Sequence, residues 1–376
     1  AGVSLITGTQ NTLVGANAGD SLTTGTNNVA IGFEALATED EHSYNVAVGH
    51  RALKTQNAGA SAYNTAVGYN TGLSVTTGTL NTIVGGLAGD ALTTGAENTA
   101  LGYQAMTNAN STESRNVAIG AYALQGLDNG STTNTYNVAV GYSAGILVST
   151  GVNNTLIGSH AGDALTTGTN NVAIGYEALS SQQTDGQNVA IGVGALQNQN
   201  VSGHGNNTAI GLHAGNDITT GTGNTILGCS AGDALTEGDN NIIIGLNAAA
   251  SAVGVNNEIT LGDANISAIR CQVQSISALS DERDKTDIQD STYGLDYINS
   301  LRPVTFEWNN REESVHKGTK DVGFIAQELQ KVDDEYTKLV LTDNPERLEA
   351  SYARLIPVLV KAIQDLSEEV KQLKNK

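Results

Sequence analysis

The sequence predicts an all-β repeat solenoid, a parallel β-roll of about 14 coils of about 17 residues each, followed by a small α+β domain that ends in a helix. Three observations predict this fold. A unit of Asn, three apolar or Thr positions and Gly recurs along most of the chain. Aromatic residues make up only 4% of the 376 residues, whereas glycine occurs 44 times. Fourteen of the 18 Lys and Arg residues lie after residue 279, so the composition changes there.

Fourteen clear copies of the unit set the length of the solenoid. Most begin 17 residues apart, and a fixed period of this kind is typical of a solenoid in which each copy forms one coil. A degenerate copy at residues 256–262 ends the repeat, which predicts a solenoid over residues 1–262 and a trimeric β neck over residues 263–279. The recurring asparagines should stack on one another and bind backbone groups of the turns. They stand at positions 11, 28, 45, 64, 81, 98, 116, 137, 154, 171, 188, 207, 224 and 241.

Both faces of the expected strand are apolar. The first and third residues after each asparagine are Thr, Val, Ile or Leu, and the residue between them is Ala in nine coils and Leu or Ile in five. Side chains alternate along a strand, so a sheet with two apolar faces needs cover on both. One face can line the interior of the coil. We expect the small alanines to lie on the other face, against a closely approaching second copy of the chain, most simply in a homotrimer.

A longer period divides the solenoid into blocks of four coils. The coils that begin at Asn11, Asn81, Asn154 and Asn224 have Leu or Ile in the middle of the strand. In each of the three complete blocks, the link from the third coil to the fourth is longer than the others and rich in polar residues and Gly. These links, at residues 54–63, 125–136 and 197–206, are expected to protrude as loops and are our candidates for receptor contact.

Composition excludes several classes of function. The net charge of −20 argues against nucleic acid as a partner, and no apolar run is long enough for membrane insertion. Cys229 and Cys271 are isolated, which favours two buried small hydrophobic residues over a disulfide or a metal site. The sequence therefore predicts no cofactor and no metal.

Three ligand-binding interpretations of the repeat are less favoured. A calcium roll needs tandem GGxGxD copies, whereas Gly-Asp occurs once per block, with Asp at positions 20, 90, 163 and 233. An ice-binding face needs Thr-x-Thr on successive coils, whereas such pairs recur only every fourth coil. A glycan depolymerase needs paired carboxylates, whereas Glu34, Glu177 and Asp185 are scattered over different turns.

The coil pattern resembles that of the heads of trimeric autotransporter adhesins. The motif "NVAIG" begins at residues 28, 116, 171 and 188, and the resemblance covers residues 10–262. It implies left-handed parallel β-rolls assembled as trimers and says little about a ligand.

Residues 280–376 have mixed helix and strand patterns. "YGLDYINSL" predicts a short helix, "RPVTFEWN" a strand, and "DVGFIAQELQKV" a strand that leads into a helix. Residues 352–376 are expected to be helical, and their apolar spacings of four and three predict a coiled-coil seam with copies of the same helix. A helix packed on its own domain is the alternative. The seam consists of Leu359, Ile363, Leu366, Val370 and Leu373.

The same region closely resembles the intramolecular chaperone domain at the C-terminal ends of phage tailspikes, tail fibres and endosialidases. The matching segments are "LSDERDKTDI", "LRPVTFEW", "GFIAQEL" and "YARLIPVLVKAIQDL". The resemblance implies a domain that forms trimers, guides folding of the β-structure before it, and then cuts itself off. Carried over to this chain, the catalytic pair is Ser280 and Lys285, and the cut falls between Leu279 and Ser280.

The residue types suit this chemistry. A Ser hydroxyl becomes a good nucleophile when a base removes its proton, and Lys is a suitable base where burial or nearby positive charge lowers its pKa. Arg283 is the candidate for that charge, and Asp281 and Asp287 are candidates for positioning Lys285. Without the surrounding motifs, a Ser five residues before a Lys would indicate an N-capping Ser instead.

Together these patterns predict a trimeric phage tail fibre or tailspike segment for host attachment, located in the virion tail and facing the host from outside. The expected partners are two more copies of the chain and a host-surface receptor, either a glycan or a protein. Single-turnover self-cleavage is the only enzymatic activity expected. A bacterial or prophage-encoded trimeric surface adhesin with the same terminal domain is the alternative.

Overall fold

The chain divides into two compact units, Ala1–Asp263 and Ala264–Lys376. A computed structural model describes residues 1–108, 112–128, 134–184, 186–266, 268–270, 280–309, 318–342 and 348–375. Residue 267 and residues 271–279 of the predicted neck lie outside the described residues. The domain boundaries that the sequence predicts at residues 262 and 279 therefore stay predictions.

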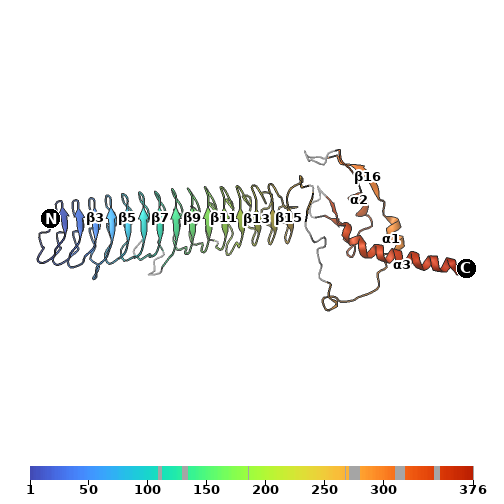
Figure 1. Cartoon of the computed structure of the whole chain (residues 1–376), viewed down its shortest axis with the longest axis horizontal. Helices are drawn as coiled ribbons and strands as arrows, with labels where there is room; N and C mark the ends of the chain where they lie inside the picture. The colour runs from blue at the N-terminus through green and yellow to red at the C-terminus, as the bar shows by residue number, and fades with distance from the viewer. Residues whose placement is uncertain are drawn as a thin grey trace. The chain divides into compact units, whose positions relative to one another are not determined.

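The first unit is a parallel β-solenoid of about 14 turns, which confirms the predicted fold class (Figure 1). Fifteen strands form one sheet in chain order, and each pairs in parallel with the strand of the next coil. The strands are β1 (Thr12–Val14), β2 (Val29–Ile31), β3 (Val46–Val48), β4 (Thr65–Val67), β5 (Thr82–Val84), β6 (Thr99–Leu101), β7 (Val117–Ile119), β8 (Val138–Val140), β9 (Thr155–Ile157), β10 (Val172–Ile174), β11 (Val189–Ile191), β12 (Thr208–Ile210), β13 (Thr225–Leu227), β14 (Ile242–Ile244) and β15 (Ile259–Leu261).

The repeated asparagines form a ladder, as the sequence predicted. The side-chain oxygen of each accepts a hydrogen bond from the backbone N–H of the next, as Asn28 Oδ1 does from Asn45 N at 2.9 Å. In most coils the side-chain amide also donates to the carbonyl 14 residues later, as Asn28 Nδ2 does to His42 O at 2.9 Å. These buried amides thereby satisfy turn groups that would otherwise be unpaired. Glu258 takes the ladder position after Asn241, because its N–H donates to Asn241 Oδ1 at 2.9 Å.

The glycine that ends each strand is required by both its conformation and its surroundings. Gly49 has a φ of +137°, and a Cβ there would lie 2.1 Å from the carbonyl oxygen of Gly68 in the next coil. Only glycine allows the coils to approach this closely.

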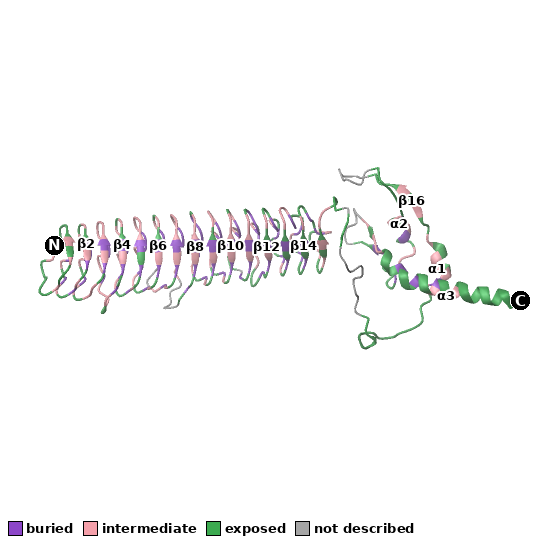
Figure 2. Ribbon diagram, viewed as in Figure 1, coloured by how far each residue is buried: buried purple, intermediate pink, exposed green. Residues whose placement is uncertain are grey.

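The alanines of the strands point into the coil, so the expectation that they face a second copy is wrong. Ala30, Ala47 and Ala173 are fully buried, and Figure 2 shows buried strand positions recurring from coil to coil. The interior is thin, and an Ala in the strand leaves room for a Leu on the opposite turn, as with Ala30 and Leu36, both fully buried. Alternation along a strand separates its two faces but does not say which of them is inside.

The same exchange of side-chain size occurs in the first coil of each four-coil block. In the first coil of a block the strand carries a large residue and the turn carries a glycine. A Cβ on Gly162 would lie 2.8 Å from the side chain of Leu156, and one on Gly232 would lie 2.9 Å from that of Ile226. Interiors pack at nearly constant density, so a large residue on one wall requires a small one opposite.

The outward side of the sheet is uncharged. We define the outer face as the first and third residues after each of the fourteen ladder asparagines, two positions per coil. Every one is Thr, Val, Ile or Leu, and all are half-buried or exposed in the single chain. Exposed apolar surface of this extent is typical of an interaction site.

The second unit combines short helices with two small antiparallel sheets, as the sequence predicted. Strand β16 pairs with β17, and β18 pairs with β19. Leu329, Leu339, Val340 and Leu355 form its core. The elements are η1 (Glu282–Asp284), α1 (Leu295–Ser300), β16 (Val304–Glu307), β17 (Lys320–Gly323), α2 (Ala326–Leu329), β18 (Val340–Leu341), β19 (Glu349–Ala350), η2 (Tyr352–Arg354) and α3 (Leu355–Lys374).

Helix α3 has two apolar faces. One packs on its own unit, because Leu355, Val358 and Ala362 are buried and Asp365 Oδ2 accepts a hydrogen bond from Leu295 N at the start of α1. The other face is the predicted seam, which lies open. The exposed fractions are 44% for Leu359, 67% for Ile363, 49% for Leu366, 41% for Val370 and 70% for Leu373. The helix therefore packs on its own domain and still leaves the seam available.

Two further predictions from the sequence concern the cysteines and membrane-spanning segments. Cys229 is a free thiol but only half-buried, so the expectation that it is a core residue is wrong, while Cys271 lies outside the described residues. Within the described chain, no helix is both long enough and apolar enough to cross a bilayer.

Candidate active site

A single tight turn holds the predicted catalytic pair. Helix η1 is one turn long, and Asp281 caps its N-terminus by accepting a hydrogen bond from Arg283 N at 2.9 Å. Lys285 ends the turn, and its N–H donates to Glu282 O. A short polar residue at such a cap satisfies an N–H group that the helix leaves unpaired.

The turn brings the side chains of Ser280 and Lys285 together. Lys285 Nζ lies 2.7 Å from Ser280 Oγ and 3.3 Å from Ser280 O. This is hydrogen-bond distance, which is the geometry that a nucleophile and its base require. Leu279, on the other side of the predicted cut, lies outside the described residues.

The predicted supporting residues interact mainly with each other. Asp281 accepts from Arg283 Nε at 3.0 Å and lies 2.6 Å from its terminal nitrogen. The Arg283 side chain holds the pKa of Asp281 below its ordinary value, and the Asp281 carboxylate raises the pKa of Arg283. Asp287 has a left-handed backbone, with a φ of +53°. Their roles toward Lys285 stay predictions.

The whole turn is open to solvent in the single chain. Ser280, Lys285 and the residues between them are all exposed. The turn therefore supplies the contact between the two groups but not the burial that would activate the Lys.

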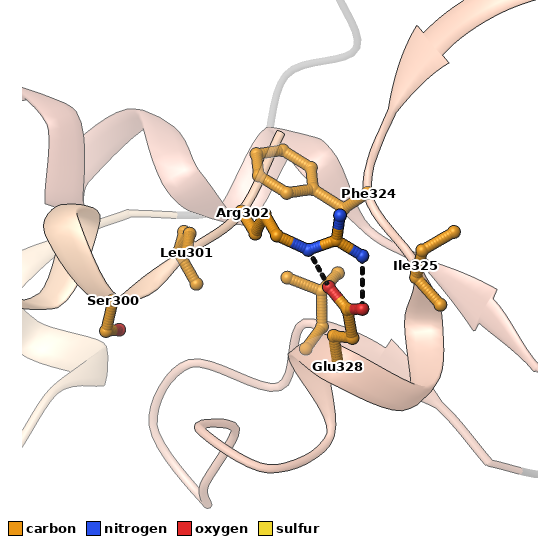
Figure 3. Close-up of a pocket in the computed structure, with 7 residues that line it drawn as sticks. Ser300, Leu301, Arg302, Phe324, Ile325 and Glu328 are labelled. Carbon is orange, nitrogen blue, oxygen red and sulfur yellow. Dashed lines mark hydrogen bonds and ion pairs between the residues drawn. The ribbon is translucent and has the colours of Figure 1, made fainter. Parts of the chain in front are cut away.

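An ion pair joins the segment before β16 to α2 within the second unit. Arg302, just before β16, binds both carboxylate oxygens of Glu328 on α2, with Nε 2.9 Å from Oε2 (Figure 3). Both residues belong to motifs that the sequence singles out, "LRPVTFEW" and "GFIAQEL", but the pairing between them was not predicted. Ser300, Leu301 and Phe324 line the small cleft beside it, which is too narrow for an organic ligand.

Of the carboxylates considered for a glycan depolymerase, the two that the structure describes have separate partners. Glu34 forms ion pairs with Arg51 and Lys54, at 2.9 and 2.8 Å, and the hydrogen bond from Lys54 keeps the pKa of Glu34 below its ordinary value. Glu177 accepts from Gln197 Nε2 at 2.6 Å. Asp185 lies outside the described residues.

Comparison with known proteins supports the assignment of the second unit. The family model described as chaperone of endosialidase, Peptidase_S74, matches residues 280–341, so the match begins at Ser280 and ends before α3. This family is one of self-cleaving chaperone domains, and it suggests a homotrimeric assembly. A β-solenoid followed by such a domain fits a tail fibre with a C-terminal chaperone. No curated protein matches the chain.

Sequence reasoning missed several buried polar residues of the solenoid, among them Glu39, Gln56 and Glu113. Glu39 is fully buried in the coil interior, and its Oε1 lies 2.6 Å from His42 Nδ1. The residue eleven places after a ladder asparagine points into the coil. A charged residue at that position of the repeat is the sequence signal that could have identified Glu39.

Proposed function

We propose that the chain is a segment of a trimeric phage tail fibre or tailspike for host attachment, and that its second unit directs assembly and then releases itself by cleavage between Leu279 and Ser280. The observation that carries the proposal is the 2.7 Å contact between Ser280 Oγ and Lys285 Nζ at the first residues of the segment that matches the chaperone family.

The proposed reaction is an acyl shift followed by hydrolysis. Lys285 Nζ takes the proton of Ser280 Oγ, which attacks the carbonyl carbon of Leu279. A C–O bond forms, the C–N bond between Leu279 and Ser280 breaks, and the proton passes to the released amine of Ser280. Water then hydrolyses the ester, which leaves a carboxylate on Leu279 and restores the Ser280 hydroxyl.

Burial of the turn by other subunits would make this reaction depend on assembly. The turn is exposed in one chain, and removing Lys285 from water would favour its neutral, basic form. Cleavage would then follow correct packing of three chains, and the released fibre would lack the element that aligned it. Such a product is kinetically stable, because its chains have no easy route to exchange.

Two exposed apolar surfaces support a trimer. The outer face of the solenoid holds no charged residue in a chain of net charge −20, so it is a surface on which identical chains can meet without strong repulsion. The open seam of α3 offers a second contact with heptad spacing. We place the fibre in the virion tail, with the lengthened links as candidate contacts for a glycan or protein receptor on the host.

Gel electrophoresis and intact-mass analysis of the freshly expressed chain test the proposal. We expect two fragments, divided between Leu279 and Ser280. Ser280→Ala and Lys285→Ala should each give one full-length band, whereas the control Lys331→Ala, which removes another exposed lysine of the same unit, should cleave normally. Continued cleavage in either dyad variant would refute the dyad, and absence of cleavage in the trimeric wild-type chain would refute self-release.

A further inference from the structure

Glu39 is one of two fully buried acidic residues in the described part of the solenoid, and the other is Glu113. The residue eleven places after a ladder asparagine faces the interior, where most coils have an aliphatic residue such as Leu22 or Leu165. Among the described residues at this position, Glu39 alone is ionisable. The corresponding coil of the third block has Gln182 in its place, also fully buried. The coil therefore accommodates a neutral polar side chain here, and Glu39 introduces a carboxylate that folding does not require.

Two further ligand-type side chains lie at the same turn. The carboxylates of Glu39 and Asp40 and the imidazole of His42 each place a donor atom within 4.8 Å of the other two. His42 Nδ1 is 2.6 Å from Glu39 Oε1 and 3.8 Å from Asp40 Oδ1. Tetrahedral bonds of about 2.1 Å to nitrogen and oxygen ligands would set neighbouring donor atoms about 3.4 Å apart. The two distances from His42 Nδ1 to the carboxylate oxygens lie on either side of this expected donor–donor distance.

The buried carboxylate is only half satisfied. Glu39 is completely buried, and its Oε2 has no hydrogen-bond partner among the described residues, although Oε1 accepts from His42 N at 3.2 Å and contacts His42 Nδ1. A buried carboxylate oxygen without a partner is costly, and a bound cation is one of the few ways to compensate such a charge. An ion pair with His42 alone leaves this oxygen unsatisfied.

We propose that Glu39, Asp40 and His42 bind one divalent transition-metal ion of the Zn²⁺ type, with water completing the coordination. One imidazole and two carboxylates are a donor set that suits Zn²⁺, and a site with three protein ligands keeps a fourth position for water. The sequence predicted no metal, because it has neither a Cys pair with ligand spacing nor tandem calcium repeats. Here the ligands are close in sequence but come together only because the coil turns Glu39 inward and His42 back toward it.

The bound ion would fasten the turn between the second and third coils. His42 O also accepts the ladder bond from Asn28 Nδ2, and Asp40 O accepts from Thr23 N at 2.7 Å in the preceding coil. A metal held by this turn would therefore also stabilise the contact with the preceding coil and the ladder bond from Asn28. Binding free energy adds to folding stability where the unfolded chain binds the ion weakly.

Isothermal titration of ZnCl₂ into the untagged full-length chain, after treatment with a chelator, tests the site. We expect binding of one ion per chain and a higher thermal unfolding midpoint with Zn²⁺. Glu39→Gln should weaken binding by about tenfold or more, and it should fold because Gln182 occupies the equivalent position. His42→Asn should weaken binding similarly, because it removes the imidazole ligand while it keeps a polar side chain at this partly buried position.

Glu41→Gln is the matched control. It removes the same charge from the same turn, but Glu41 is exposed and is not among the three clustered residues. Its affinity should equal that of the wild-type chain. Equal affinity in all four proteins would mean nonspecific attraction to an acidic surface and would overturn the proposal, as would absence of Zn²⁺ binding to the wild-type chain.

Discussion

The two units are stabilised by different kinds of contact. The solenoid relies on repetition, because each coil has a ladder asparagine, an inward Ala, Leu or Ile in the strand, and a glycine against the next coil. The second unit has a small irregular core and joins segments distant in sequence, as when Asp365 on α3 binds Leu295 N on α1. Each coil thus has well-defined contacts within its own chain. The outer face, however, is nearly identical from coil to coil.

This difference gives a physical reason for a repetitive solenoid to carry a non-repetitive unit at its end. Two copies of a uniform face can pair in several registers with similar energy. In the proposed function, a unique unit with an exposed seam on α3 would give a single alignment, and cleavage at the exposed Ser280–Lys285 turn would remove that unit afterwards. Each of the following variants or conditions changes either the solenoid or the C-terminal unit.

The largest effect is expected from a charge on the outer face. Ile174→Asp would place three carboxylates in the proposed interface, and an uncompensated buried charge costs about 3–5 kcal/mol. Trimers should be lost, while circular dichroism of the single chain should change little because Ile174 does not face the coil interior. Asn170→Asp adds the same charge to an exposed residue of the same coil. Equal sedimentation of the two variants would exclude this face as the interface.

A strong effect is also expected from the asparagine ladder. Asn154→Ala would leave Asn171 N and Gly168 O without the bonds that Asn154 makes at 3.0 and 2.9 Å. Each unsatisfied buried group costs about 1–3 kcal/mol, so the denaturation midpoint of the rod should fall clearly. The exposed Asn200→Ala should cost little. Similar midpoints for both would mean that the ladder contributes little to stability.

A smaller effect is expected from the helix seam. Burying one large aliphatic side chain contributes about 1.5–3 kcal/mol, and Ile363→Asp would remove that contribution from the α3 contact. The fraction of chain that assembles and cleaves should fall, whereas Gln364→Asp, on an exposed residue next to the seam, should leave it unchanged. Normal yield of cleaved trimer from Ile363→Asp would show that α3 does not align the chains.

The smallest effect concerns pH. Burial raises the pKa of Glu39 above its ordinary value of 4.5, although hydrogen bonding to His42 opposes the shift. The folded state therefore holds this proton more tightly than the unfolded state. In the absence of metal, the unfolding free energy should fall as the pH rises from 4.5 through the folded pKa, by at most about 1.4 kcal/mol per pH unit. Urea midpoints of wild type and Glu39→Gln, measured across this range, should converge at low pH, and parallel curves would contradict the assignment.

Much of the fold could be predicted because the repeat encodes it directly. The ladder role of residues such as Asn28 follows from its period, and the short helix, hairpin strand and terminal helix of the second unit follow from local patterns. The sequence could not predict that Ala30 points into the coil, because side-chain alternation is the same whether the alanines point inward or outward. Glu39 and the Arg302–Glu328 pair depend on how turns bring side chains together, which spacing does not report. The Ser280–Lys285 pair was identified only through the surrounding motifs.

Native mass spectrometry of the released rod, residues 1–279, tests the central claim most directly. The account predicts a particle of three chains that persists after the C-terminal unit has left, because the outer faces then cover one another. A stable, soluble single chain with its outer face in water would contradict it.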